Sequence, residues 1–207
     1  MSSAPTLNHR FPVVPAVSAD NEISENLVRF TEVQLLMPGR FGDARGFFSE
    51  TFNRSQLEQR GIRHDWVQDN HSLSEPRGVV RGLHFQVPPQ AQAKLIRVVR
   101  GAIFDVVVDL RPDSPTRHQH AWAVLSAENW RQLYVPIGFA HGFCTLQQNT
   151  EVIYKVSAYY SRADERAVLW NDPALGIPWP LEPEEAVLSA KDGAAPLLAE
   201  LPVIDWA

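Results

Sequence analysis

Short apolar segments alternate with turn-forming residues along most of the chain. These segments are dense in β-branched and aromatic residues, and glycine and proline separate them. Many short strands at this spacing are typical of a sandwich or barrel rather than of βαβ units. The pattern predicts strands at Val28–Leu36, Phe47–Phe52, Trp66–Asn70, Val79–Phe85, Lys94–Val99, Ile103–Leu110, Ala121–Leu125, Gln132–Val135 and Glu151–Val156.

The remaining segments predict little regular structure. One helix is expected near Arg54–Arg60, with Asn53 as its N-cap and Gly61 as its stop. Four prolines between residues 171 and 192 predict a loop there, with at most a brief helix. Residues 1–27, rich in Ser, Pro and Ala, predict a mobile N-terminal arm. We therefore expect one all-β domain over residues 28–192, followed by a C-terminal tail over residues 193–207.

Composition narrows the class of protein. A length of 207 residues, 44% hydrophobic and 21% charged content fit a single globular domain. The net charge of -5 argues against a general nucleic-acid surface but permits a local basic pocket. No apolar run is long enough to span a bilayer, and the N-terminus does not resemble a signal peptide. With Cys144 as the single cysteine, which we expect to be buried and inert, a reducing cytoplasm is the predicted location.

Two segments carry the chemistry. Arg81–Gln86 places His84 on an apolar strand and is followed by Lys94, while Pro136–His141 places a second histidine beside another apolar strand. Their spacing resembles the two motifs of cupins, which are jelly-roll barrels that hold a metal with histidines and a carboxylate. Here Gln86 and Lys94 stand where a histidine and the carboxylate would be needed. An amide and an ammonium bind divalent cations poorly, so we expect no metal.

A narrower family fits a larger part of the chain. The sequence resembles the dTDP-4-dehydrorhamnose 3,5-epimerases, which are metal-free cupins, in order from about residue 28 to residue 192. The matching segments are Phe41–Glu50, Gln68–Ser72, Arg81–Gln86, Gln92–Leu95, Asp109–Arg111, Ser126–Asn129, Tyr134–Phe143, Tyr154–Lys155, Trp170–Pro173, Trp179–Pro180 and Leu188–Asp192. The resemblance implies a cupin-type jelly-roll barrel with short helices and an N-terminal arm.

The resemblance also implies the reaction. Enzymes of this family invert C3 and C5 of dTDP-4-dehydro-6-deoxy-D-glucose, on the route to dTDP-L-rhamnose, without a cofactor. Each inversion needs a base, a group that stabilises enolate oxygen, and an acid on the opposite face. A homodimer is implied because part of each site comes from the N-terminal strands of the neighbouring subunit. An enzyme that inverts only C3 or only C5 of a related sugar remains the alternative.

Catalytic roles follow by match to the family. His84 is the expected base, Lys94 the group that faces the ketone oxygen, and Tyr154 the acid. Asp192 is expected to orient His84, although Asp172 also lies in a late motif and could instead do so. From the sequence pattern alone, Lys94 could equally be a solvated lysine, and Tyr154 could be an aromatic that fills the barrel.

The expected substrate-binding residues divide by the part of the ligand they contact. Arginine forks suit phosphate oxygens, although Arg45 could instead pair with Asp43 or Glu50. His141 is expected to line the sugar pocket. The full predicted set comprises Arg45, Arg81 and Lys191 for the pyrophosphate, Glu50, Gln68 and Asn70 for polar contacts, Phe48 and Tyr160 for stacking, and His141.

Two other function classes remain open from the sequence. One is a jelly roll that binds a nucleotide sugar without turning it over, and the other is a metal-dependent cupin enzyme. The His118-x-His120 pair has the spacing of metal ligands, but it follows a proline-rich turn and is predicted to be solvated surface.

Overall fold

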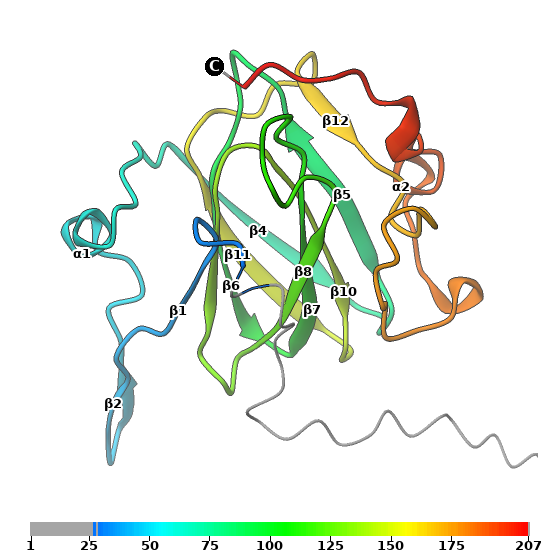
Figure 1. Cartoon of the computed structure of the whole chain (residues 1–207). Helices are drawn as coiled ribbons and strands as arrows, with labels where there is room; N and C mark the ends of the chain where they lie inside the picture. Colours follow the sequence, from blue (N-terminus) through cyan, green and yellow to red (C-terminus); the bar gives the residue numbers. More distant parts are fainter. Residues whose placement is uncertain (1–26, 28, 207) are drawn as a thin grey trace, which may run out of the picture.

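The computed structural model describes residue 27 and residues 29–206. The predicted N-terminal arm therefore lies almost wholly outside the described residues. Two five-stranded antiparallel sheets pack face to face as a jelly-roll barrel (Figure 1). In spatial order the first consists of β1 (Gln34–Leu36), β9 (Gln132–Val135), β6 (Lys94–Arg100), β11 (Thr150–Val156) and β4 (Gln68–Ser74). The second consists of β12 (Glu165–Ala167), β5 (Val80–Gln86), β10 (Phe139–Thr145), β7 (Ala102–Asp109) and β8 (His120–Ser126).

The smaller elements lie outside the two sheets. Strands β2 (Phe41–Asp43) and β3 (Gly46–Phe48) form a separate hairpin that projects away from the barrel, on the same side as α1 (Arg54–Gln59) (Figure 1). Near the C-terminus are α2 (Ala190–Gly193) and two 3-10 turns, Pro183–Glu185 and Leu198–Glu200. No helix among the described residues is both long and apolar enough to cross a membrane.

Strand β7 shows how the core is divided. All of its residues are buried, because one face looks into the barrel and the other lies under the C-terminal segment. Ile103 and Val107 belong to the cluster between the sheets, whereas Phe104 belongs to the cluster that includes Trp170 and Trp179. Burial on both faces explains why apolar residues occupy both faces of the strand instead of alternating with polar ones. The C-terminal segment is thus packed on the second sheet, and Figure 1 shows it beside β5.

The two histidine segments meet at a close approach of β5 and β10. His84 on β5 lies directly opposite His141 on β10. Gly82 has φ of 116°, and a Cβ there would lie 2.6 Å from the Cα of Gly142. Only glycine accepts both that backbone conformation and that separation. The glycine therefore permits the strands to bring the two histidines together.

The predicted strands between residues 66 and 156 all overlap observed ones. The predicted helix is confirmed, since Asn53 Oδ1 accepts a hydrogen bond from Gln56 N at 3.2 Å and Gly61 follows the helix with φ of 83°. Two N-terminal predictions were wrong over most of their length. Residues 29–33 form turns and only Gln34–Leu36 is a strand, while strand structure at Phe47–Phe52 ends at Phe48.

Candidate active site

A pocket opens between the two sheets, at the ends of β4, β5, β6, β11 and β12. Polar and titratable side chains from both sheets converge there. Residues far apart in the sequence meet because the jelly-roll topology places their strands at one mouth of the barrel. The lining residues are Gln68, Asn70, His84, Phe85, Gln86, Gln92, Lys94, Tyr154, Tyr160 and Glu165.

His84 is held by a carboxylate from the C-terminal segment. Its Nε2 lies 2.5 Å from Oδ1 of Asp192, which comes from α2. Burial raises the pKa of the Asp192 carboxyl, but hydrogen bonds with His84 and Ser189 lower it by more, so its net pKa is below the usual value. An ionised Asp192 accepts the Nε2 proton and leaves Nδ1 of His84 as the basic nitrogen.

Ser189 in turn holds Asp192. Its hydroxyl donates to Asp192 Oδ2 at 2.7 Å and accepts from the Asp192 backbone N at 3.1 Å, so Ser189 is also the N-cap of α2. Both carboxylate oxygens of Asp192 are therefore occupied. Ser189 lies in the matching segment Leu188–Asp192, but the sequence analysis gave it no role, although a serine three residues before an aspartate is a recognisable cap pattern.

Asp172, the alternative partner for His84, is used elsewhere. Its Oδ1 accepts from Ala174 N at 2.9 Å, and its Oδ2 accepts from Leu198 N at 2.6 Å. Asp172 is buried and ties the Asn-Asp-Pro turn to the end of the chain. The geometry therefore places Asp192, and not Asp172, on the histidine.

Lys94 points into the barrel and is only 8% exposed. Its Nζ donates to the backbone oxygen of His84 at 3.1 Å. Burial lowers the pKa of Lys94, and the negative charges of Asp105 and Glu165 raise it by less, so that the net pKa is about 8. The ammonium is thus mostly charged at neutral pH, inside a site where its field is weakly screened.

Tyr154 lines the pocket from β11, on the sheet opposite His84. Burial is the main reason that the pKa of its phenol is raised; Arg81 lowers that pKa and Glu165 raises it further. The phenol therefore stays protonated at neutral pH. A proton acceptor and a proton donor face one cavity from opposite sheets.

Gln86, at the position of the second cupin histidine, has a structural role. Its Nε2 donates to the backbone oxygens of Gln90 at 2.6 Å and Tyr159 at 3.1 Å, and its Oε1 accepts from Ser161 N at 2.7 Å. The amide thereby joins the loops on either side of the pocket. Across the part of the chain that the structure describes, no three His, Cys, Asp or Glu side chains are grouped so that they could hold a metal ion.

Glu165 is a pocket residue that the sequence did not indicate. Its Oε2 accepts from the hydroxyl of Tyr160 at 2.9 Å and pairs with the ammonium of Lys191. Burial raises the pKa of the Glu165 carboxyl, but these two partners lower it by more. Glu165 thus holds two predicted binding residues, Tyr160 and Lys191, at the rim of the pocket. The sequence did not indicate Glu165 because it lies in a charged stretch that resembles exposed surface.

The other predicted binding residues fall into two groups. Gln68 and Asn70 line the pocket. Arg81 is not among the lining residues, and its guanidinium donates to Ser74 Oγ at 3.3 Å and to the backbone oxygen of Leu73 at 3.3 Å. His141 is buried behind the pocket and is not among the lining residues; its Nε2 lies 2.6 Å from Asp105 Oδ1.

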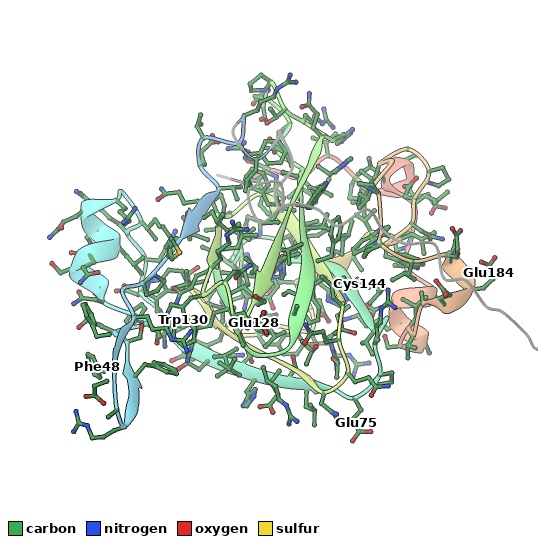
Figure 2. All side chains as sticks on the ribbon, turned by 90° about the horizontal axis from the view of Figure 1, so that it is seen from below. Phe48, Glu75, Glu128, Trp130, Cys144 and Glu184 are labelled. Carbon is green, nitrogen blue, oxygen red and sulfur yellow. The ribbon has the colours of Figure 1, made fainter. Side chains whose placement is uncertain are left out.

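Arg45, Phe48 and Glu50 lie away from the pocket of their own chain. The Arg45 side chain pairs with Asp43 at the tip of the hairpin, and Glu50 accepts hydrogen bonds from residues of the α1 region. Phe48 is 70% exposed, and Figure 2 shows it on the protruding hairpin, on the opposite side of the molecule from Glu184 in the C-terminal segment.

His118 and His120 differ from each other in their surroundings. His118 is exposed, as predicted, but His120 is half-buried and its Nδ1 lies 2.9 Å from the backbone oxygen of Leu175. The prediction of a solvated pair was therefore wrong for His120. Cys144 is buried, as expected, and burial raises the pKa of its thiol to about 12.

A jelly-roll barrel whose pocket combines a histidine–aspartate pair, a buried ammonium and a buried phenol is a cupin-type barrel equipped for proton transfer. This arrangement is suited to removing a proton from a carbon next to a carbonyl and returning one from the other side, which is the chemistry of isomerases.

Comparison with known proteins gives the family within that class. The family model described as dTDP-4-dehydrorhamnose 3,5-epimerase matches residues 28–200. The dTDP-4-dehydrorhamnose 3,5-epimerase of Sinorhizobium fredii is 52% identical over 83% of this chain and 88% of its own. The crystal structure of dTDP-4-dehydrorhamnose 3,5-epimerase from Bacillus anthracis, with TDP and PPi bound, is 54% identical, with a TM-score of 0.80 over 85% of this chain and 99% of the other.

A more distant solved structure is a 3'-monoepimerase from Streptomyces bikiniensis in complex with dTDP-quinovose. It is 36% identical, with a TM-score of 0.74 over 81% of this chain and 84% of the other. The chain belongs to the dTDP-4-dehydrorhamnose 3,5-epimerase family.

Proposed function

We propose that this protein inverts C3 and C5 of dTDP-4-dehydro-6-deoxy-D-glucose in dTDP-L-rhamnose biosynthesis, without a cofactor. The observation that carries the proposal is the convergence of the Asp192-bound His84, the ammonium of Lys94 and the phenol of Tyr154 on one pocket. Similar proteins bind TDP or a dTDP-sugar, which supports the nucleotide part of the substrate. The single buried Cys144 needs no oxidising compartment, which supports a cytoplasmic location.

The reaction follows from these residues. His84 Nδ1 removes the proton from a carbon next to the C4 ketone, and the electron pair of the broken C–H bond forms the enolate. Negative charge then develops on the C4 oxygen, where the Lys94 ammonium stabilises it. Tyr154 donates a proton to the opposite face of the same carbon, which inverts the centre. Solvent then reprotonates the tyrosinate and takes the proton from the imidazolium, so that both groups are restored for the second centre.

The configuration of the product tests this function against its alternative. The substrate is incubated with the protein, and an NADPH-dependent reductase traps the 4-keto product for NMR analysis. We expect inversion at both C3 and C5. A product inverted at one centre would place the protein with single-centre epimerases, as the likeness to the 3'-monoepimerase permits, and recovery of unchanged substrate would contradict the proposal.

The positioning role of Ser189 gives one mutational prediction. Ser189→Ala removes the hydroxyl that holds Asp192 Oδ2, and we expect kcat to fall about 10-fold with little change in KM. The lost cap costs about 1 kcal/mol of folding stability, measured by thermal melting. Ser189→Thr retains the hydroxyl and should restore kcat. An alanine variant with wild-type kcat would show that Asp192 needs no such support.

A homodimer completes the site in this proposal, because the expected binding residues Arg45 and Phe48 cannot act on the pocket of their own chain. Exposed apolar side chains gather on and before the hairpin: Met37, Phe41, Phe47 and Phe48 are 70%, 68%, 52% and 70% exposed. An exposed apolar patch of this kind is typical of an interface. The occupant proposed is a second copy of the chain, whose pocket receives the hairpin.

Subunit complementation tests that arrangement. Arg45→Ala is expected to raise KM about 10- to 100-fold by removing a phosphate contact, and His84→Ala to abolish turnover. Co-expression of the two variants gives hybrid dimers with one intact site, so activity measured at substrate concentrations well below the raised KM returns to about one quarter of wild type. If Arg45 instead acted within its own chain, no hybrid site would be intact and mixing would restore nothing. Light scattering of the wild type checks the dimer mass.

A further inference from the structure

A carboxylate lies in the middle of the most deeply buried strand. Asp105 is fully buried on β7, between Phe104 and Val106, on the face that looks into the barrel. An ionised carboxylate is costly in such surroundings unless other groups compensate its charge. Asp105 takes no part in the proton transfers proposed for the epimerisation.

Half of the Asp105 carboxylate has no hydrogen-bond partner. Oδ1 lies 2.6 Å from Nε2 of His141. Oδ2 is buried and accepts no hydrogen bond from any residue that the structure describes. His141 therefore fixes the orientation of the carboxylate while one oxygen keeps its full capacity to interact with a positive charge.

The neighbouring positive charge is Lys94. Its Nζ has three donors and gives one of them to the backbone oxygen of His84. The other charged or titratable groups around it are Asp105 on β7, Glu165 on β12, His84 on β5 and Tyr154 on β11. Glu165 already forms an ion pair with Lys191. Oδ2 of Asp105, by contrast, has no hydrogen-bond partner among the described residues. Of the two carboxylates, Asp105 also acts more strongly on the lysine.

We propose that Asp105 is a positioning residue that supplies the buried counter-charge of Lys94, keeping the ammonium protonated while His141 holds the carboxylate in place. Burial alone favours the neutral amine, which could not stabilise an enolate. The claim that the Lys94 charge matters for turnover rests on the proposed function. The claim that Asp105 interacts with Lys94 is independent of that function. His141 thereby acts on the site through Asp105 without lining the pocket.

Titration of Lys94 by ¹⁵N NMR, without substrate, tests the interaction directly. Asp105→Asn removes the charge with almost no change of shape, and we expect the pKa of Lys94 to fall by about one unit or more. Asp109→Asn is the matched control, because Asp109 is also buried on β7 but bonds to Arg111, Ser114 and Thr116 instead. An unchanged pKa of Lys94 in folded Asp105→Asn protein would overturn the proposal.

The reciprocal variant gives a second test that does not need the Asp105 substitution to fold. Lys94→Met removes the cation, so the ¹³C chemical shift of the Asp105 carboxyl carbon should differ from that of wild type, whereas the shift of the Asp109 carboxyl carbon should not. An Asp105 carboxyl shift that stays the same in folded Lys94→Met protein would also overturn the proposal.

The pH dependence of kcat/KM connects the interaction to turnover. In Asp105→Asn the activity is expected to decline at lower pH than in wild type, because Lys94 loses its proton earlier. A purely structural role would lower activity at all pH values without moving this decline, and that result would contradict the positioning role. A wild type without epimerase activity would overturn the proposed function, while the NMR titrations would still decide the Asp105–Lys94 interaction.

Discussion

Replacing His84 by asparagine is expected to lower kcat about 100- to 10,000-fold. Asparagine keeps a polar side chain of similar size but offers no basic nitrogen to remove the proton next to the ketone. Asp192 cannot take over as the base. Its carboxylate comes from α2 and lies 2.5 Å from His84 Nε2 in the wild type, so it is on the far side of the imidazole from the basic nitrogen Nδ1. The rate is measured by coupling product formation to NADPH oxidation by a reductase in excess.

The control for this variant is a histidine with no role in the pocket. His71→Asn changes a histidine on β4 that is 54% exposed and pairs with Glu151, and its kcat should match wild type. The affinity of His84→Asn for dTDP, measured by calorimetry, should also stay near wild type. Turnover of His84→Asn within ten-fold of wild type would show that another group is the base.

Replacing Lys94 by methionine is expected to lower kcat about 100- to 1,000-fold. Methionine fills a similar volume but carries no charge, so the enolate oxygen loses its stabilising partner. Since Lys94 is only 8% exposed, little water can take the place of the ammonium. The same coupled assay measures the loss, and circular dichroism checks that the variant is folded.

The pH dependence of kcat/KM tests whether the protonated form of Lys94 is the active one. Burial lowers the pKa of Lys94 to about 8, so the wild-type kcat/KM should decline above that pH as the ammonium deprotonates. The residual activity of Lys94→Met should lack this decline. If the decline near pH 8 persisted in the methionine variant, it would belong to another group and the role given to Lys94 would be wrong.

The strands that the sequence predicted correctly are those in which the apolar residues of the sequence are also the buried residues of the barrel. β6, β7 and β9 are apolar runs bounded by turn residues, and burial in the barrel gives them that composition. The sequence missed β10 and β12, and the two strands were missed for opposite reasons. β10 is fully buried yet carries His141, Gly142 and Cys144, whereas β12 is a short charged edge strand that looks like surface.

The error at residues 29–33 also has a physical cause. Phe30 and Val33 are buried in the cluster between the sheets, so the segment is apolar enough to resemble a strand. Its backbone nevertheless turns instead of pairing with a neighbouring strand. Hydrophobic periodicity reports burial of side chains, and it does not report whether the backbone joins a sheet.

The central part of the candidate site could be identified from family motifs, but its supporting residues depend on the fold. His84 and Lys94 were indicated by the cupin spacing, but the sequence left Asp192 and Asp172 open as the partner of His84, and the geometry decided for Asp192. Glu165 could not be found because its partners are decided by topology. Asp105 did leave a signal, since it is a charged residue inside the apolar run Ile103–Leu110.

The most direct test of the central claim is solvent deuterium incorporation at C3 and C5 during turnover in D₂O. Proton removal by His84, followed by return of a proton from the other face, predicts deuterium at both carbons for wild type and at neither for His84→Asn, with the trapped product analysed by NMR. A product inverted at C3 and C5 that retains its original protons there would contradict exchange through His84 and Tyr154, and with it the account of the site given above.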